Sequence, residues 1–400
     1  MAREMKNSGV QWIGEIPSNW NTIQLKRHSH VVSGKEVKVE LEPEDENAVP
    51  VYGSGGVFKY TDREQYNGEV VMFGRKGTIG KPLYVNDSFW AVDTMYFLIH
   101  ERAYLFPKFN YYQLSAFNWE LYTTQTALPS IVASQILDSK FPFPPLAEQK
   151  AIADFLDAKC GEIDGLLADL DAEVKTLTEY KKSIIAETVT RGLNPNAPMK
   201  QVALGWIDEL PANWSVARIA SVYSVRNEKV SDQDYQPLSV TMKGIVPQLE
   251  NAAKTKHGDD RKLIRKGDFV INSRSDRRGS CGISPYDGSC SLINTVLAPR
   301  EEMNPRYYNW LFHTTQFADE FYKWGYGIVD DLWTTNWGAM RRIQIPVPSL
   351  EEQEEIAAYL DVKVPKIDET ISLKQDQIET LKAYKSSLIY EYVTGKKQVL

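Results

Sequence analysis

An internal duplication constrains this chain more than any other feature of its sequence. The stretch WIGEIPSNW at residues 12–20 returns as WIDELPANW at residues 206–214, and PPLAEQKAIADFLD at 144–157 returns as PSLEEQEEIAAYLD at 348–361. The offset grows from 194 to 204 residues, so the second middle is about ten residues longer. This pattern predicts two similar halves, each with an opening motif, a variable middle, an EQ segment and a long tail.

Both tails have the apolar spacing of a coiled coil, with intervals that alternate between four and three residues. Lys181 and Lys385 stand at seam positions, where a polar residue can set register. Gly161 and Pro365 share one aligned position and predict a break between a short EQ helix and a long helix. The alternative is two amphipathic helices on separate cores. The seams are Ile163, Leu167, Leu170, Val174, Leu177, Lys181, Ile184 and Thr188, then Ile367, Ile371, Lys374, Ile378, Leu381, Lys385, Leu388 and Tyr392.

The middles are expected to be rich in β-strand. Short apolar runs at 70–73, 95–99 and 269–271 are bounded by Gly, Asp and Asn, as strands are. The aromatic-rich stretches 106–122 and 304–322 predict one helix in each middle. The tryptophans of the repeated nonapeptide are interpreted as packing anchors rather than as platforms for base stacking.

Composition limits the possible classes of protein. The chain has no apolar run of 18 residues and no apolar segment typical of a secretory signal, so we expect neither a membrane span nor export. Three cysteines form no CxxC pair, which predicts a reducing, cytoplasmic environment. The five histidines lack metal-site spacing, so we expect no metal and no other cofactor.

The motifs that resemble catalytic ones are incomplete. GTIGKP at 77–82 lacks the first glycine and the hydroxyl residue of a phosphate loop, and YGSGG at 52–56 is not a dinucleotide fingerprint. NPRY at 304–307 resembles the base-holding motif of amino-methyltransferases, but Arg replaces one proline and no glycine-rich cofactor loop precedes it, so a plain helix start is the favoured interpretation. The sequence therefore predicts no catalytic residues.

Basic residues in Gly-rich turns favour nucleic-acid binding, although the net charge is −7. Residues 254–278 hold nine basic and four acidic side chains, and the acidic excess is confined to the two tails. The alternative is a solvated hairpin tip. Loops 124–135 and 323–337 are further candidates for groove contact. The candidate DNA-binding residues are Arg75, Lys76, Thr78 and Lys81 in the first half and Arg274, Ser275, Arg277 and Arg278 in the second.

The ordered set of motifs, present twice, resembles the specificity subunits of type I restriction–modification systems. The resemblance rests on W-I-x-E-[IL]-P-x-N-W, the EQ segments with I-A-x-[FY]-L-D, and the ID…YK…VT tails. It implies two target-recognition domains that read a split DNA site, and no catalysis by this chain. It also implies two docked methyltransferase subunits and motor–nuclease subunits. Because the middles differ from each other, residue-level base contacts cannot be transferred from the family.

With this resemblance, we expect an α+β fold in which two β-rich domains are separated by two long antiparallel helices. These helices form a pseudo-two-fold symmetric coiled coil of roughly 39 Å between residues 163 and 188, close to one duplex turn of ~34–36 Å. The expected boundaries are 1–143 and 193–347 for the recognition domains, with 144–192 and 348–400 for the helical spacers. Two other functions stay open: a coiled-coil scaffold that reads no DNA, and a nuclease or methyltransferase with an unrecognised site.

Overall fold

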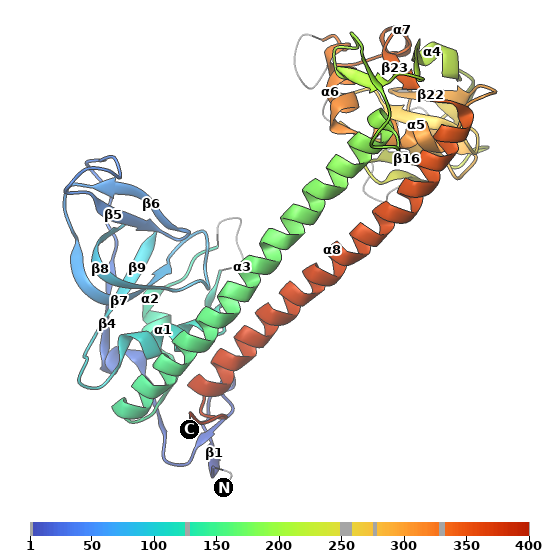
Figure 1. The fold of residues 1–400 in the computed structure, drawn as a ribbon. Helices are drawn as coiled ribbons and strands as arrows, with labels where there is room; N and C mark the ends of the chain where they lie inside the picture. The colour runs from blue at the N-terminus through green and yellow to red at the C-terminus, as the bar shows by residue number, and fades with distance from the viewer. Residues whose placement is uncertain (1–2, 125–128, 249–257, 275–277, 328–332, 400) are drawn as a thin grey trace. The chain divides into compact units, whose positions relative to one another are not determined.

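A computed structural model describes residues 3–124, 129–248, 258–274, 278–327 and 333–399. The chain forms two compact units (Figure 1). Unit 1 consists of Met1–Asp171 and Gln375–Leu400, and unit 2 consists of Ala172–Lys374. Each unit therefore contains one β-rich middle and part of both long tails. Among the described residues, no helix has both the length and the apolar character needed to cross a membrane.

Unit 1 is built on a six-stranded sheet. Neighbouring strands are antiparallel except for one parallel pair, β5 with β8. Both faces of β7 are buried: Val71 and Phe73 pack toward α1, whereas Val70 and Met72 join a second core on the opposite face. In sheet order the strands are β4 (Ser29–Ser33), β9 (Met95–His100), β7 (Tyr66–Gly74), β8 (Leu83–Ala91), β5 (Val49–Gly53) and β6 (Gly56–Thr61). The helices are η1 (Leu25–Arg27), α1 (Pro107–Ser115), η2 (Trp119–Tyr122) and α2 (Ala133–Asp138).

Unit 2 has the same kind of core with smaller sheets. Its four-stranded antiparallel sheet is β14 (Tyr223–Val225), β22 (Asn294–Pro299), β19 (Phe269–Asn272) and β20 (Cys281–Ile283). A second sheet contains β15 (Lys229–Val230), β18 (Arg261–Ile264) and β21 (Gly288–Cys290), and β16 (Leu238–Thr241) pairs with β17 (Gly244–Pro247). The helices are α4 (Ile219–Val222), α5 (Pro305–Phe312), α6 (Thr315–Lys323) and α7 (Trp337–Met340).

The repeated motifs meet in the same way in each unit. The opening motif forms a short ribbon, and the strand after it pairs with the strand that leads into the EQ segment. The indole nitrogen of Trp20 donates to Glu148 at 2.9 Å, and that of Trp214 donates to Glu352 at 3.1 Å. The expected role of these tryptophans as packing anchors is confirmed, since both are fully buried. The ribbons are β1 (Met5–Asn7) with β2 (Glu15–Pro17), β3 (Asn21–Gln24) with β10 (Lys140–Phe143), β11 (Met199–Gln201) with β12 (Glu209–Pro211), and β13 (Ser215–Arg218) with β23 (Gln344–Val347).

The two tails are single helices, α3 (Leu146–Arg191) and α8 (Leu350–Val393). The expected break at Gly161 and Pro365 is therefore wrong. Pro365 lies inside α8 without ending it, because Leu360 and Val364 before it and Ile367 after it are buried on one side of the helix. Burial of one continuous apolar face outweighs the hydrogen bond that a proline removes.

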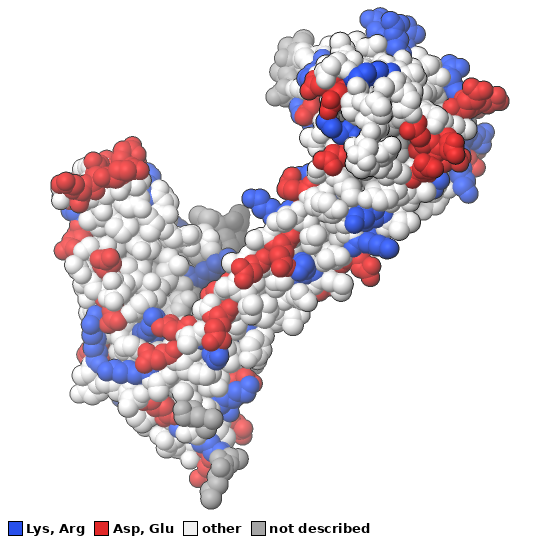
Figure 2. Space-filling view, in the orientation of Figure 1, with Lys and Arg blue, Asp and Glu red and all other residues white. Residues whose placement is uncertain are grey.

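The predicted seam is confirmed, because every stripe position of α3 and α8 is at least partly buried. Three ion pairs join the helices: Lys385 with Asp164 at 2.6 Å in unit 1, and Lys181 with Asp368 at 2.6 Å and Lys374 with Glu173 in unit 2. Across these pairs the residue number in α3 rises from 164 to 181 while the residue number in α8 falls from 385 to 368, so the two helices are antiparallel. Acidic and basic side chains are interspersed along them (Figure 2).

The predicted helices at 106–122 and 304–322 are each interrupted. In unit 1, α1 ends at Ser115 and a separate turn begins at Trp119. In unit 2, α5 ends at Phe312 with His313 as its C-cap, and Thr314 caps α6, because its side chain accepts a hydrogen bond from the Phe317 amide at 3.2 Å. A side-chain cap of this kind starts a new helix. Asn304 caps α5 in the same way, which confirms that NPRY is a plain helix start.

Candidate nucleic-acid interface

The first group of candidate residues lies on the loop 75–82, which joins the antiparallel strands β7 and β8 and is called basic loop 1 below. Arg75, Lys76, Thr78 and Lys81 are all exposed. The last residue of β7, Gly74, pairs with Met95 at the start of β9, so the loop begins at one end of the sheet. The structure thus brings these four candidates together on one connection.

Basic loop 1 is held by backbone contacts on two sides. The Arg75 amide donates to the Thr94 carbonyl at 2.7 Å, and Lys76 forms a β-bridge with Ser130 in the segment before α2. A Cβ on Gly74 would collide with the Thr78 carbonyl oxygen, so the turn requires glycine there. The loop is therefore fixed in position while its cationic side chains point to solvent.

The second group lies on the loop 273–280, called basic loop 2, which joins the antiparallel strands β19 and β20. Arg274 forms a β-bridge with Thr334, and the Thr335 amide donates to the Ser273 carbonyl at 2.9 Å. Ser275 and Arg277 lie outside the described residues. Ser130 and Thr334 are 204 residues apart, which is the offset of the EQ segments. The same backbone clamp thus holds a basic loop in each unit, although the two loops differ in sequence.

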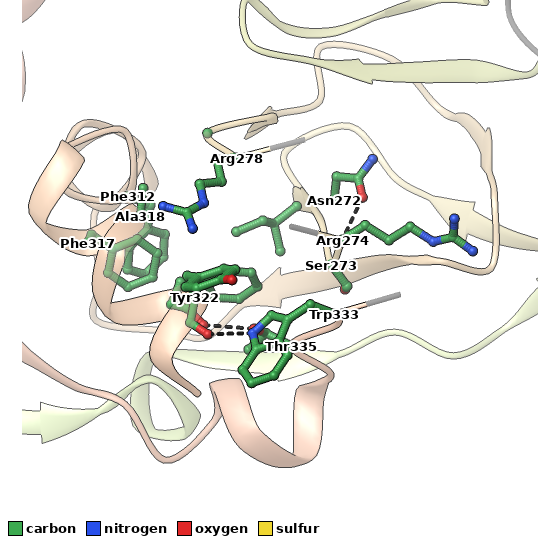
Figure 3. Close-up of a pocket in the computed structure, with 13 residues that line it drawn as sticks. Asn272, Ser273, Arg274, Arg278, Phe312, Phe317, Ala318, Tyr322, Trp333 and Thr335 are labelled. Carbon is green, nitrogen blue, oxygen red and sulfur yellow. Dashed lines mark hydrogen bonds between the residues drawn. The ribbon is translucent and has the colours of Figure 1, made fainter. Parts of the chain in front are cut away.

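The two described arginines of basic loop 2 have different environments (Figure 3). The guanidinium of Arg278 lies 3.8 Å from the centre of the Tyr322 ring and 3.4 Å from Asp319. Arg274 points away from this cluster, and within the described part of the chain its guanidinium has no hydrogen-bond or ion-pair partner. Arg274 is consequently available to a ligand, whereas Arg278 is already engaged.

The cavity beside Arg278 is too small for a nucleobase. Its space is about 20 Å³, roughly that of one water molecule. Its walls include Phe312, Phe317, Tyr322 and Trp333. A flipped base has no room in this cavity.

The cations of the basic loops differ from those of the helices. Lys181, Lys374 and Lys385 are paired with carboxylates. By contrast, the side chains of Lys76 and Lys81 have no such partner among the described residues, and Arg75 lies 5.6 Å from the ring centre of Tyr96. Cations without local carboxylates are what phosphate contact requires.

A hollow that the sequence did not predict lies next to basic loop 2. It measures about 320 Å³, and Asn227, Lys262, Ser273, Leu292, Ile293 and Trp337 are among its lining residues. The Lys262 ammonium donates to the Asn294 carbonyl at 2.6 Å, and burial lowers the pKa of this lysine. The signal that could have revealed the hollow is the apolar pair Leu292-Ile293 in a turn, where polar residues are usual.

The two cysteines of unit 2, Cys281 and Cys290, are buried. Burial raises the pKa of Cys281 to about 12 and that of Cys290 to about 11, so both thiols are neutral at physiological pH. Within the described residues there is no group of three or more His, Cys, Asp or Glu side chains placed to hold a metal ion.

Comparison with known proteins gives one consistent result. A family model described as type I restriction modification DNA specificity domain matches residues 17–175 and 211–383. The type I restriction enzyme MjaVIII specificity subunit of Methanocaldococcus jannaschii is 22% identical over 415 residues, which cover 96% of this chain and 94% of that protein. A solved structure on complex assembly and conformational transition of the type I R-M system has a TM-score of 0.67 at 15% identity, covering 96% of this chain and 99% of its own. The HsdS subunit from Thermoanaerobacter tengcongensis has a TM-score of 0.50 at 15% identity, covering 96% and 98%.

Proposed function

Because this chain belongs to the family of type I restriction-modification DNA specificity proteins, we propose that it is the specificity subunit of such a system and that each unit reads one half of a split DNA site. The observation that carries this proposal is the duplicated clamp, Lys76 with Ser130 and Arg274 with Thr334. It presents one basic loop per unit on two middles whose sequences differ. The two half-sites are therefore expected to differ in sequence.

The contacts divide by chemistry into phosphate and base contacts. Lys76 and Lys81, as exposed ammonium groups, are assigned to phosphates. Arg274, whose guanidinium has no partner within the described ranges of the chain, is assigned to a base edge, where a guanidinium can donate two hydrogen bonds to guanine. Arg75 and Thr78 lie on basic loop 1 together with those lysines. Arg278, stacked on Tyr322, positions basic loop 2.

We assign to the paired helices the spacing of the two readers, and with it the number of unread base pairs between the half-sites. Support comes from α3, which begins in unit 1 and ends in unit 2, and from α8, which does the reverse. We assign to this helical pair the docking of two methyltransferase subunits, with motor–nuclease subunits joining that complex. The specificity subunit itself is not an enzyme, and we assign modification and cleavage to its partners.

The deciding experiment is methylome sequencing of a host with and without this subunit, followed by an exchange of residues 21–140 for the corresponding middle of another family member. One half-site should change and the other should stay. A change in both half-sites would contradict the modular assignment, and methylation independent of this chain would leave a scaffold role.

The contact assignment is tested in the assembled complex by DNA binding at several salt concentrations. Arg274→Ala should weaken binding to the specific site by about 1–3 kcal/mol and relax one base position. Lys76→Ala should weaken binding to all sequences and lower the salt slope by about 1. Lys182→Ala on α3 is the matched control, because this lysine pairs within its own helix at 2.9 Å. Unchanged binding in both loop variants would remove the assignment.

A further inference from the structure

The turn Ser291–Asn294, between β21 and β22, exposes two large apolar side chains. The Asn294 amide donates to the Ser291 carbonyl at 3.0 Å, so Leu292 and Ile293 stand at the tip. They are 40% and 41% exposed. Tight turns normally carry Gly, Asn, Asp, Ser or Pro at these positions. Adjacent exposed aliphatic residues on a turn are therefore a sign of a contact surface.

The sheet register places this turn beside basic loop 2. Asn294, the first residue of β22, pairs with Asn272, the last residue of β19, and basic loop 2 begins at the next residue. The hydroxyl groups of Ser273 and Thr295 are 2.9 Å apart. Leu292 and Ile293 consequently line the same hollow as Ser273 and Thr334, and Thr334 bridges to Arg274.

Unit 1 has an equivalent turn with different chemistry. The Met95 amide donates to the Val92 carbonyl at 2.9 Å, and Met95 pairs with Gly74, after which basic loop 1 begins. The tip residues there are Asp93 and Thr94. The same backbone position next to the same kind of basic loop thus carries an aspartate and a threonine in one unit and two aliphatic residues in the other.

We propose that the Leu292–Ile293 tip reads a base pair by packing against the C5-methyl group of a thymine in the major groove of the half-site read by unit 2. This inference rests on the proposed function. The thymine methyl is the apolar group that base edges present in that groove. Flanking cations favour duplex DNA as the occupant over an apolar protein surface: the Arg274 guanidinium has no partner among the residues that the structure describes, and the Lys262 ammonium lies 2.6 Å from the Asn294 carbonyl.

The test uses the chain assembled with its methyltransferase subunits, together with DNA duplexes that contain the site identified by methylome sequencing. The half-site of unit 2 is the one that persists when residues 21–140 are exchanged. Each of its thymines is replaced in turn by deoxyuridine, which lacks only the methyl group. One replacement should weaken binding about fourfold, the loss expected for one buried methyl.

The double variant Leu292→Ala/Ile293→Ala should bind the thymine duplex about fourfold more weakly and show no further loss with deoxyuridine. The exchange Leu292→Ile/Ile293→Leu, which keeps the tip apolar, should retain the deoxyuridine penalty. The matched control Asp93→Ala/Thr94→Ala in the turn of unit 1 should also retain it. Circular dichroism and complex assembly establish that each variant is folded.

Three results would overturn the inference while leaving the proposed function intact: a half-site without thymine on either strand, equal binding of every deoxyuridine duplex, or an unchanged penalty in the alanine variant. Loss of methyltransferase binding in a folded alanine variant would assign the tip to a protein partner and overturn it too. Absence of any sequence-selective binding by the native complex would instead contradict the proposed function itself.

Discussion

The repeated EQ segments act through two adjacent side chains with separate tasks. In unit 1, Glu148 accepts the Trp20 indole N–H, while the buried Gln149 accepts the Phe106 amide at 2.9 Å and donates to the Tyr104 and Pro144 carbonyls. Phe106 precedes the first residue of α1. The start of α3 is thereby bound to both the opening motif and the first helix of the middle.

Unit 2 repeats the arrangement with different local residues. Gln353 accepts the Asn304 amide at 2.8 Å and donates to the Pro348 carbonyl at 2.9 Å, and Asn304 is the N-cap of α5. A buried amide side chain that satisfies several backbone groups is costly to replace. This explains why Glu-Gln survives in both copies while the middles diverge, and why the tryptophans bind protein rather than bases.

His100 makes the stability of unit 1 depend on pH. Burial lowers its pKa to about 4 from the ordinary 6.5, and its neutral Nε2 donates to Asn110 at 2.9 Å. Between pH 6.5 and 4 the unfolded chain binds the proton and the folded chain does not, so this contribution is present above 6.5 and is lost on acidification. From pH 7 to 5 the free energy of unfolding should fall by about 2 kcal/mol more than in His100→Gln, measured by urea titration. An equal decrease of the free energy of unfolding from pH 7 to 5 in the two proteins would contradict this prediction.

Two ion pairs between the long helices are formed by equivalent residues of the repeat. Lys181 binds Asp368 in unit 2, and Lys385 binds Asp164 in unit 1; each residue of one pair is the repeat of a residue in the other. One stretch of sequence, ID followed by YK, therefore supplies both partners when it is present twice in antiparallel helices. The sequence predicted the lysines as register residues, but their partners became visible only with the direction of packing.

A charge reversal tests this register. Lys181→Asp places two carboxylates opposite each other and should lower the free energy of unfolding by about 1 kcal/mol or slightly less, because the pair is partly exposed. Adding Asp368→Lys should restore most of the loss. The reversal Lys182→Asp, at an outward pair within α3, is the control. If the double variant were no more stable than the single one, the pair would have no role in register.

Gly161 shows where local sequence rules failed. It lies exposed within α3, and a Cβ there would meet no atom within 4 Å. Gly161→Ala should therefore raise the free energy of unfolding by about 0.5–1 kcal/mol, measured by chemical denaturation. The control is Gly192→Ala after the end of α3: Gly192 has φ of +76° and a Cβ there would come 3.3 Å from Trp214, so that variant should be destabilised. A lower free energy of unfolding in Gly161→Ala would contradict this expectation and would mean that α3 requires glycine at this position.

The elements that sequence predicted best are those fixed by long-range periodicity. The seam from Ile163 to Thr188 has a period that only helix–helix packing explains, so its burial followed directly. The break at Pro365 and the helix 304–322 were wrong because propensity rules ignore what the neighbouring residues bury. The sheet order, with parallel β5 and β8 among antiparallel strands, had no signal in the short apolar runs.

The candidate interface was predicted in part for a similar reason. Arg75, Lys76 and Arg274 stood out because charge and glycine occur together in hairpins, which is a local property of the sequence. Leu292 and Ile293 did not stand out, because two adjacent apolar residues are also typical of a β-strand. Only the strand register places them in a turn. The different surroundings of Arg274 and Arg278 depend on Tyr322 and Asp319, which are distant in sequence.

At the scale of the whole molecule, each opening motif packs against the end of a long helix. Gly192 follows α3 and lies against Trp214 in unit 2, and Gly395 follows α8 and lies against Trp20 and Pro17 in unit 1. In unit 1 the hydroxyl of Tyr390 also donates to the Ile13 carbonyl at 3.0 Å. In unit 2 the chain runs directly from the helix end to the motif through residues 193–203, which include β11, whereas in unit 1 the helix end and the motif are joined by contacts.

The chain should therefore tolerate circular permutation. A variant that opens between Asn194 and Asn196, and joins residue 399 to residue 3 through a Gly/Ser linker, keeps both helix ends against their motifs. The linker change should alter the free energy of unfolding by roughly 1 kcal/mol, because loop-closure entropy varies slowly with length. The permuted chain should assemble and direct methylation to the original site, measured by methylome sequencing. An opening inside basic loop 1 is the control that should abolish recognition of one half-site. A folded permuted chain with a changed gap between half-sites would show that the covalent linker, rather than the packed motif, sets the helix ends.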